Sequence, residues 1–282
     1  MRMNTAAAER CADGISLSDG EFEQVRKLAY ELAGISMSPS KKALVESRLR
    51  KRVVTTGVGS YRAYVQFITQ PDNAAELQTA LDLLTTNETY FFREQHHFDH
   101  LRQFVRQHRL GSKLRVWSAA CSSGEEPYSI AMLLAAERMA GDWEVLASDL
   151  STQVLARARR GHYPLSRAKG VPPEYLRAYC LKGTGSQEGT LLIDAKLRNR
   201  VQFMHRNLME PLPPGFLGEF QVIFLRNVMI YFDLAVKRKV VSNLLSALAP
   251  GGYFYIGHSE TLNGVTQALQ QVEPAIYRKI LT

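Results

Sequence analysis

The sequence predicts an α/β fold in which a small helical domain precedes a larger domain built on a parallel sheet. Residues 1–85 carry apolar side chains at helical spacing, interrupted by glycine and proline. From about residue 113, short apolar runs alternate with amphipathic segments, which is typical of parallel strands joined by crossover helices. Residues 165–200 interrupt this alternation with prolines, glycines and the strand-like run Thr190–Ile193, and predict a small β-rich insertion.

Four helices are expected in the N-terminal domain, residues 1–85. Ser18 and Glu21 form a capping box that opens the first helix, and Gly34 ends it. Serine and proline punctuation places the others at about residues 39–54, 60–70 and 73–84.

The second domain, residues 86–282, is expected to contain the sheet. Crossover helices are expected near residues 126–140, from residue 151 and near 234–248. The predicted strands are at 114–118, 143–148, 201–205, 220–225 and 253–256. Because ligands bind outside the carboxyl ends of such strands, the segments after them are the candidate site.

The composition is that of an ordinary globular protein, with 282 residues, 45% of them hydrophobic and 22% charged. The apolar runs are far shorter than the roughly 18 residues that a membrane span needs, and the first residues lack the apolar core of a secretion signal. We therefore expect a cytoplasmic monomer without membrane insertion. Three cysteines, Cys11, Cys121 and Cys180, are too few for a disulfide framework or a zinc site.

The chain is basic, with a formal charge of +8 and a sequence pI near 9.4, which suggests an anionic partner. The charge is concentrated locally: residues 41–52 hold six basic residues and a single acid, Glu46. A second basic run has no acid within it, and we leave it open between a solvated face and a partner contact. It comprises Arg157, Arg159, Arg160, Arg167 and Lys169.

The first predicted strand of the sheet ends in a turn of small residues that enters a helix, residues 118–128. Such a turn lets the backbone approach a bound molecule closely. It lacks the G-x-G-x-x-G spacing of a dinucleotide site, and Glu125 and Glu126 stand where a pyrophosphate would need amide groups. The ligand is therefore expected to carry positive charge.

Asp149 ends the second strand, where a carboxylate can accept both hydroxyls of a ribose. The alternative for this residue alone is a helix start, since the helix dipole favours an acid there. A cationic ligand with a ribose and without a pyrophosphate matches S-adenosylmethionine.

Four blocks of the chain resemble the signature blocks of the chemotaxis receptor methyltransferase family, CheR. They are TTNETYFFR at 85–93, VWSAACSSGEEPYS at 116–129, RNVMIYF at 226–232 and GHSE at 257–260. The resemblance covers about residues 17–280. It implies a helical N-terminal domain and a Rossmann-like S-adenosylmethionine-dependent methyltransferase domain with an inserted antiparallel β-subdomain. The implied reaction methylates glutamate side chains of chemoreceptors and leaves S-adenosylhomocysteine.

The resemblance also implies site residues. Arg93 and Tyr231 match the positions beside the reacting methyl group, and are the expected catalytic residues. The positions that match the cofactor-binding set are Asn87, Thr89, Arg93, Glu125, Asp149, Asn207, Leu208, Arg226 and Asn227. Leu208 is expected to act through its backbone.

Two partner surfaces follow from the same resemblance. Lys41, Arg48 and Arg52 lie on one side of the second helix, where the family docks the receptor's acidic methylation region; the alternative is a solvated helix. The inserted β-subdomain, with its glycine-rich loop at 183–189, is expected to bind the receptor's C-terminal peptide as an added strand.

No metal site is expected. His96, His97 and His100 invite a metal interpretation, but no third ligand of fixed spacing accompanies them, which favours a surface or helix-packing role.

Two other functions are weighed against the methyltransferase. A nucleic-acid methyltransferase would suit the pI, but the Asp/Asn-Pro-Pro-Tyr type of motif is absent after the fourth strand, and no nucleic-acid partner is expected. A non-catalytic sensor of the same fold is disfavoured because Arg93, Asp149, Asn227 and Tyr231 are all present.

Overall fold

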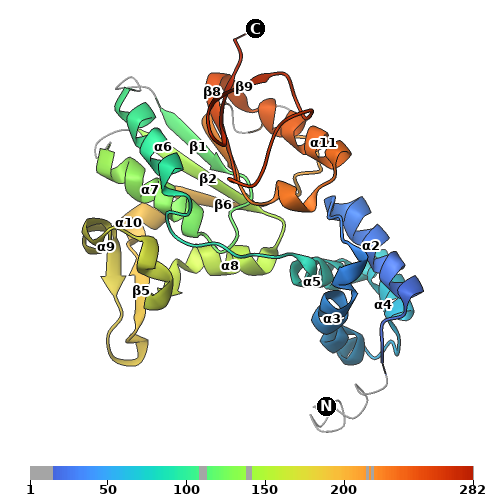
Figure 1. Cartoon of the computed structure of the whole chain (residues 1–282). Helices are drawn as coiled ribbons and strands as arrows, with labels where there is room; N and C mark the ends of the chain where they lie inside the picture. Colours follow the sequence, from blue (N-terminus) through green and yellow to red (C-terminus); the bar gives the residue numbers. More distant parts are fainter. Residues whose placement is uncertain (1–14, 108–112, 138–141, 214–215, 217–218, 282) are drawn as a thin grey trace. The chain divides into compact units, whose positions relative to one another are not determined.

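The computed structural model describes residues 15–107, 113–137, 142–213, 216 and 219–281, and divides the chain into two compact units, Met1–Thr86 and Asn87–Thr282 (Figure 1). Cys11 lies outside the described residues. The predicted fold class is confirmed: an all-helical unit precedes a mixed α/β unit that contains a seven-stranded sheet and a separate three-stranded antiparallel sheet. None of the described helices is long and apolar enough to cross a membrane.

The first unit contains the four expected helices, α2 (Asp19–Ala33), α3 (Lys42–Thr56), α4 (Tyr61–Ile68) and α5 (Ala74–Leu84). Short 3-10 turns η1 (Pro39–Lys41) and η2 (Pro71–Asn73) precede α3 and α5. The capping box of Ser18 and Glu21 is present, and Gly34 ends α2 in the left-handed conformation. The apolar faces of the helices close over a core centred on Val45, Leu49 and Tyr64.

The large sheet has the strand order β6-β2-β1-β7-β8-β10-β9. Its first five strands in that order run parallel: β6 (Val201–His205), β2 (Trp143–Asp149), β1 (Leu114–Ser118), β7 (Phe220–Leu225) and β8 (Leu248–Ile256). The hairpin β9 (Leu269–Glu273) and β10 (Ile276–Lys279) adds an antiparallel edge that the sequence analysis did not predict.

Helices cover both faces of this sheet because successive strand residues point to opposite sides. On one face Val116, Val145 and Phe224 pack in a core with α6 (Gln95–Gln107) and α7 (Glu125–Glu137). On the other face Trp117 and Ile223 pack with α11 (Leu234–Leu245). Figure 1 shows α6 and α7 on the side of the sheet away from α11.

The smaller sheet has the order β3-β5-β4, from β3 (His162–Pro164), β5 (Thr190–Ile193) and β4 (Cys180–Lys182). It follows α8 (Thr152–Arg160) and precedes α10 (Ala195–Arg198). The insertion expected at 165–200 therefore begins with β3, a few residues earlier. It also holds more helix than its prolines and glycines suggested: η3 (Leu165–Gly170), α9 (Pro173–Tyr179) and η4 (Gly185–Gln187).

Candidate active site

The site expected from the sequence lies at the carboxyl ends of β6, β2, β1 and β7, which are consecutive neighbours in the sheet. The chain leaves β1 for β2 on one side, and β7 pairs with β1 on the other. The end of β1 is thus the place where the strand order reverses and where open α/β sheets bind their ligands.

The turn that follows β1 requires glycine at position 124. Gly124 has φ +99, and a Cβ there would lie 2.8 Å from the Tyr163 hydroxyl and 2.9 Å from the Ala158 Cβ. The Cys121 amide donates to the Ser148 carbonyl at 2.9 Å, which holds the turn against the end of β2. The turn therefore brings small side chains and backbone, rather than bulk, to the end of the strand.

Asp149 is buried at the end of β2 and ties the site together. Its Oδ2 accepts from the Ser122 amide at 2.8 Å, and its Oδ1 accepts from the Ser151 amide at 2.9 Å. Ser151 is itself the N-cap of α8. The helix-start interpretation is therefore part of what this residue does. Each oxygen of an ionised carboxylate accepts more than one hydrogen bond, so ribose binding is compatible with both contacts.

Glu125 is fully buried and is paired with a basic residue of the insertion. Its Oε1 accepts from the Arg167 guanidinium, with Nε at 3.1 Å, and its Oε2 accepts from the Ser123 hydroxyl at 2.6 Å. Arg167 also donates to the Thr89 carbonyl at 3.0 Å. Arg167 belongs to the basic run that the sequence left open, and the ion pair gives it an intramolecular partner.

Glu126, by contrast, faces the protein interior. Its Oε1 accepts from the Ser118 hydroxyl at 2.7 Å and its Oε2 from Arg226 Nη1 at 2.9 Å. Burial raises the pKa of Glu126, and the Arg226 guanidinium acts against that rise. Of the two carboxylates proposed to attract a cationic ligand, Glu126 is therefore committed to Arg226.

Arg226 is the centre of a buried charge network. Its side chain is 1% exposed, and besides Glu126 it donates to Glu94 Oε2 at 3.0 Å and to the Arg93 carbonyl. Burial alone would raise the pKa of Glu94, but Arg226 and the hydrogen bonds from Asn227 and His258 outweigh it and lower that pKa. The guanidinium thus holds together the ends of β7 and α7 and the segment before α6.

Asn227 sits in a constrained backbone position in this network, with φ 58. Its side-chain amide donates to Glu94 Oε1 at 3.2 Å, and its backbone amide donates to Glu260 Oε2 at 3.0 Å. Glu260 also accepts from the Gly257 amide at 2.6 Å. A Cβ at Gly257 would lie 2.4 Å from the Asn227 amide nitrogen, so this close packing requires glycine.

Arg93 lies between two residues with positive φ, Phe92 at 54 and Glu94 at 60. Its guanidinium stacks over the Tyr90 ring at 5.5 Å and donates to the Glu88 carbonyl at 3.2 Å. Its Nε is 4.0 Å from Glu94 Oε1, beyond hydrogen-bond distance. The side chain is 28% exposed, so this positive charge is partly accessible and is only loosely paired.

The remaining predicted residues lie around the same strand ends. The Asn87 carbonyl accepts from the Ser122 hydroxyl at 2.9 Å, which places the segment with Asn87 and Thr89 against the glycine turn. Asn207 and Leu208 follow β6; the Asn207 side chain accepts from the Met209 amide at 3.0 Å and the Leu208 carbonyl accepts from the Asn243 amide.

Tyr231 ends the 3-10 turn η5 (Met229–Tyr231), which follows β7. Its side chain is half-buried and packs against the core that α11 covers. It therefore lies in the segment that continues directly from Arg226 and Asn227.

Three residues of this site were not predicted from the sequence: Glu94, Arg167 and Glu260. Glu94 directly follows the expected catalytic arginine, and Glu260 ends the GHSE block, so the only available signal was adjacency to a motif. Arg167 lay in a basic run whose role depends on tertiary packing.

The predicted docking residues are described within the first unit alone. Arg48 donates to the Leu84 and Thr85 carbonyls at 2.9 and 3.1 Å, and so caps the end of α5. Arg52 pairs with Glu76 through both ends of its guanidinium fork. Lys41 is exposed, as is Lys51, which lies one turn beyond Arg48. The basic face is real, but two of its three predicted members also stabilise the helical unit.

Comparison with known proteins assigns both units. Residues 20–85 match the family model described as CheR methyltransferase, all-alpha domain, and residues 87–277 match CheR methyltransferase, SAM binding domain. The chain belongs to the CheR methyltransferase family.

Its relatives match over nearly their whole length. The chain is 40% identical over 265 residues to the chemotaxis protein methyltransferase of Salmonella typhimurium, covering 93% of this chain and 91% of the relative. It is 38% identical over 264 residues to that of Escherichia coli, covering 92% and 90%. A third relative, chemotaxis protein methyltransferase 2 of Pseudomonas aeruginosa, is 39% identical over 263 residues, covering 91% and 92%.

The predicted CheR resemblance and its cofactor, S-adenosylmethionine, are therefore confirmed. The site of this CheR family member suits that cofactor, because the buried Asp149 carboxylate stands beside a turn where only glycine fits. The role of each individual residue remains a prediction.

Proposed function

We propose that this CheR methyltransferase transfers the methyl group of S-adenosylmethionine to glutamate side chains of chemoreceptors, for adaptation in chemotaxis signalling. The products would be glutamate methyl esters and S-adenosylhomocysteine. The relatives named chemotaxis protein methyltransferase support the pathway. The observation that carries the substrate class is the loosely paired, partly exposed Arg93 at the strand ends.

The chemistry requires little from the enzyme beyond alignment. When bound, S-adenosylmethionine supplies a methyl group on a sulfonium with a good leaving group. A glutamate carboxylate, with an ordinary pKa of about 4.3, is already ionised at neutral pH and requires no general base. Holding the reactants in line and excluding water can lower the barrier by roughly 7–11 kcal/mol in favourable cases. A site without a proton-transfer pair agrees with this reaction.

Arg93 is suited to hold the substrate carboxylate. Its planar fork can bind both oxygens, whereas Arg226 and Arg167 at the same strand ends are already paired with carboxylates. The positive φ at Phe92 and Glu94, and the Arg226 bond to the Arg93 carbonyl, set the direction of the Arg93 segment. Tyr231 would close the site next to it.

The cofactor is assigned to the strand ends. Asp149 would accept the ribose hydroxyls, and the loop with Asn207 and Leu208 would contact the adenine. Glu125, with Asn87 and Thr89 nearby, would face the positively charged end of the ligand. Arg226 and Asn227 would contribute through the backbone at the end of β7, because their side chains are engaged with Glu94.

The function is tested by methyl transfer from labelled S-adenosylmethionine to receptor-containing membranes, followed by mild alkali. Label that appears on the receptor and leaves as methanol would support a carboxyl methyl ester. Label on added RNA or DNA instead would favour a nucleic-acid methyltransferase. Cofactor binding without transfer to any receptor would favour a non-catalytic sensor.

Replacing Asp149 by asparagine is expected to weaken binding of S-adenosylhomocysteine by about 10-fold or more. A hydrogen bond to a charged group contributes roughly 1.5–3 kcal/mol, and the substitution removes the charge. Titration calorimetry measures the affinity. Asp142→Asn, at an exposed aspartate, is the control and should bind like the parent. Parent-like affinity in Asp149→Asn would remove the ribose assignment.

The basic face of α3 is proposed to dock an acidic segment of the receptor, as predicted for Lys41, Arg48 and Arg52. Exchanging Lys41 and the neighbouring Lys51 for glutamate should raise KM for the receptor about 10-fold and leave kcat unchanged, because like charges then oppose the substrate. Steady-state kinetics at low salt measures this. Lys27→Glu, on α2 of the same unit, makes a matched charge change. An equal rise in KM there would show that only net charge matters.

The small sheet is proposed to bind the receptor's C-terminal peptide along the edge strand β4. Leu181 on that strand is 54% exposed, and it lines an open pocket with His162, Lys182 and Thr184. The strand order β3-β5-β4 leaves β4 with one unpaired edge, to which a peptide can add as a strand.

Leu181→Glu is therefore expected to lower the affinity for the receptor's terminal peptide by about 10-fold or more, since burial of a leucine contributes roughly 1.5–3 kcal/mol. Fluorescence anisotropy with a labelled peptide measures it. Val272→Glu, an exposed apolar residue on β9, serves as the control. Unchanged peptide affinity in Leu181→Glu would place the peptide elsewhere.

A further inference from the structure

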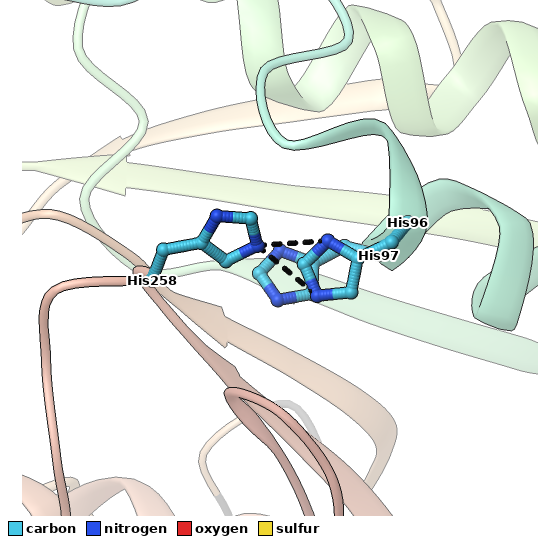
Figure 2. A group of neighbouring side chains, drawn as sticks. All are labelled: His96, His97 and His258. Atoms are coloured by element: carbon cyan, nitrogen blue, oxygen red, sulfur yellow. Dashed lines mark hydrogen bonds between the residues drawn. The ribbon is translucent and has the colours of Figure 1, made fainter.

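Three histidines from two distant segments meet beside the active site (Figure 2). His96 and His97 lie in the first turn of α6, and His258 follows β8. One ring nitrogen of each lies within 4.8 Å of the others, and His258 Nε2 is 2.8 Å from His96 Nδ1. Within the described residues, the third imidazole that sequence spacing did not reveal is thus supplied by tertiary structure.

His97 is the member that requires an explanation. Its side chain is 0% exposed, and neither ring nitrogen has a hydrogen-bond partner among the described residues. Leaving a buried polar group unsatisfied costs roughly 1–3 kcal/mol. Burial, together with the charges of Arg226 and the neighbouring histidines, lowers the pKa of His97 to about 2. The ring is therefore neutral, which is the form that binds metal ions.

The surroundings orient the rings as metal ligands are usually oriented. A ligating histidine typically directs its second nitrogen at a carboxylate or a backbone carbonyl. His96 Nε2 lies 3.2 Å from the Pro274 carbonyl, which leaves Nδ1 toward the cluster. His97 Nδ1 lies 3.4 Å from Glu94 Oε2, which leaves Nε2 for a ligand.

The spacing also suits an ion of the size of zinc. Zinc–nitrogen bonds of about 2.0–2.1 Å in tetrahedral geometry separate two ligand nitrogens by roughly 3.3 Å. The His258 and His96 nitrogens, at 2.8 and 3.2 Å, need to move by only tenths of an ångström. His258 is exposed, so an ion can enter from solvent.

We propose that His96, His97 and His258 bind a divalent transition-metal ion of the zinc type, with Glu94 as the carboxylate behind His97. Imidazole nitrogens favour such ions over magnesium or calcium. The ion would join the start of α6 to the turn after β8. That turn carries Glu260, which holds the Asn227 backbone, so the ion would stiffen one wall of the active site.

The test uses the full-length, untagged protein, stripped with a chelator and titrated with Zn²⁺ against a chromophoric competitor. One tight Zn²⁺ per chain is expected, and Co²⁺ substitution should give the intense visible bands of a tetrahedral site. His258→Asn, an exposed position unlikely to disturb folding, should weaken Zn²⁺ binding at least about 10-fold. His205→Asn, at an exposed histidine outside the cluster, should bind like the parent.

Thermal denaturation provides a second measurement. Zn²⁺ should raise the Tm of the parent and of His205→Asn, but not that of His258→Asn, because an ion that binds only the folded state stabilises it. Equal Zn²⁺ affinity in His258→Asn and the parent would overturn the proposal, as would weak binding that both histidine variants reduce alike. Neither cofactor nor receptor is present, so the result is independent of the proposed methyl transfer.

Discussion

Replacing Arg226 by methionine is expected to lower the free energy of unfolding of the methyltransferase unit by about 3–5 kcal/mol. Removing one member of a buried ion pair costs that much because it leaves a charge without compensation. Here both Glu94 and Glu126 would lose their guanidinium partner, while the Arg93 carbonyl would lose its donor. Urea denaturation followed by circular dichroism measures the change, with the two units of the chain fitted as separate transitions.

Two further variants identify the cause of this loss. Arg157→Met, at an exposed arginine of α8, should change stability by no more than about 0.5 kcal/mol. Adding Glu126→Gln to Arg226→Met should recover part of the stability, since it removes one of the uncompensated carboxylates. If Arg226→Met is as stable as Arg157→Met, the network does not hold the strand ends together.

Replacing Arg93 by alanine is expected to reduce kcat by about 100-fold or more and to change the affinity for S-adenosylhomocysteine by only a few-fold. Small errors in the placement of reacting groups cost about that factor, and Arg93 is proposed to orient the substrate carboxylate. Because its side chain is partly exposed and only loosely paired, its loss should leave the fold intact. Methyl transfer to receptor membranes and calorimetry measure the two effects separately.

Arg93→Lys is the informative control for this result. Lysine keeps the positive charge but loses the planar fork, so its activity should fall between those of the parent and Arg93→Ala. A lysine variant as active as the parent would show that charge alone is needed. If Arg93→Ala instead lost cofactor affinity and kept kcat, its role would be cofactor binding rather than substrate orientation.

Local signals in the sequence predicted local structure well. The Ser18–Glu21 capping box and the helix ends at Gly34 and Gly57 depend on side chains within one turn of each other, and all three are present. Alternation of apolar runs and helices was enough to predict the parallel sheet, because strand burial is written into consecutive residues. The β9–β10 hairpin escaped prediction because its strand β9 is largely exposed and lacks an apolar pattern.

The charged groups of the site show the limit of the same reasoning. The sequence indicated that Glu125 and Glu126 follow the first strand, but both were expected to face the ligand. The structure pairs Glu125 with Arg167 of the insertion and Glu126 with Arg226 of β7, 42 and 100 residues away in the chain. The partner of a buried charge depends on how elements stack, which periodicity does not report.

By itself, the sequence determined the two-unit α/β architecture, the CheR family and the strand ends where the cofactor residues gather. These features rest on hydrophobic periodicity, caps and contiguous motifs, which are set by neighbours along the chain. Only the tertiary structure decided the Arg226 network and the meeting of His96 and His97 with His258, 162 residues beyond His96. Those contacts form because packing brings the start of α6 against the turn after β8, a proximity that no local spacing encodes.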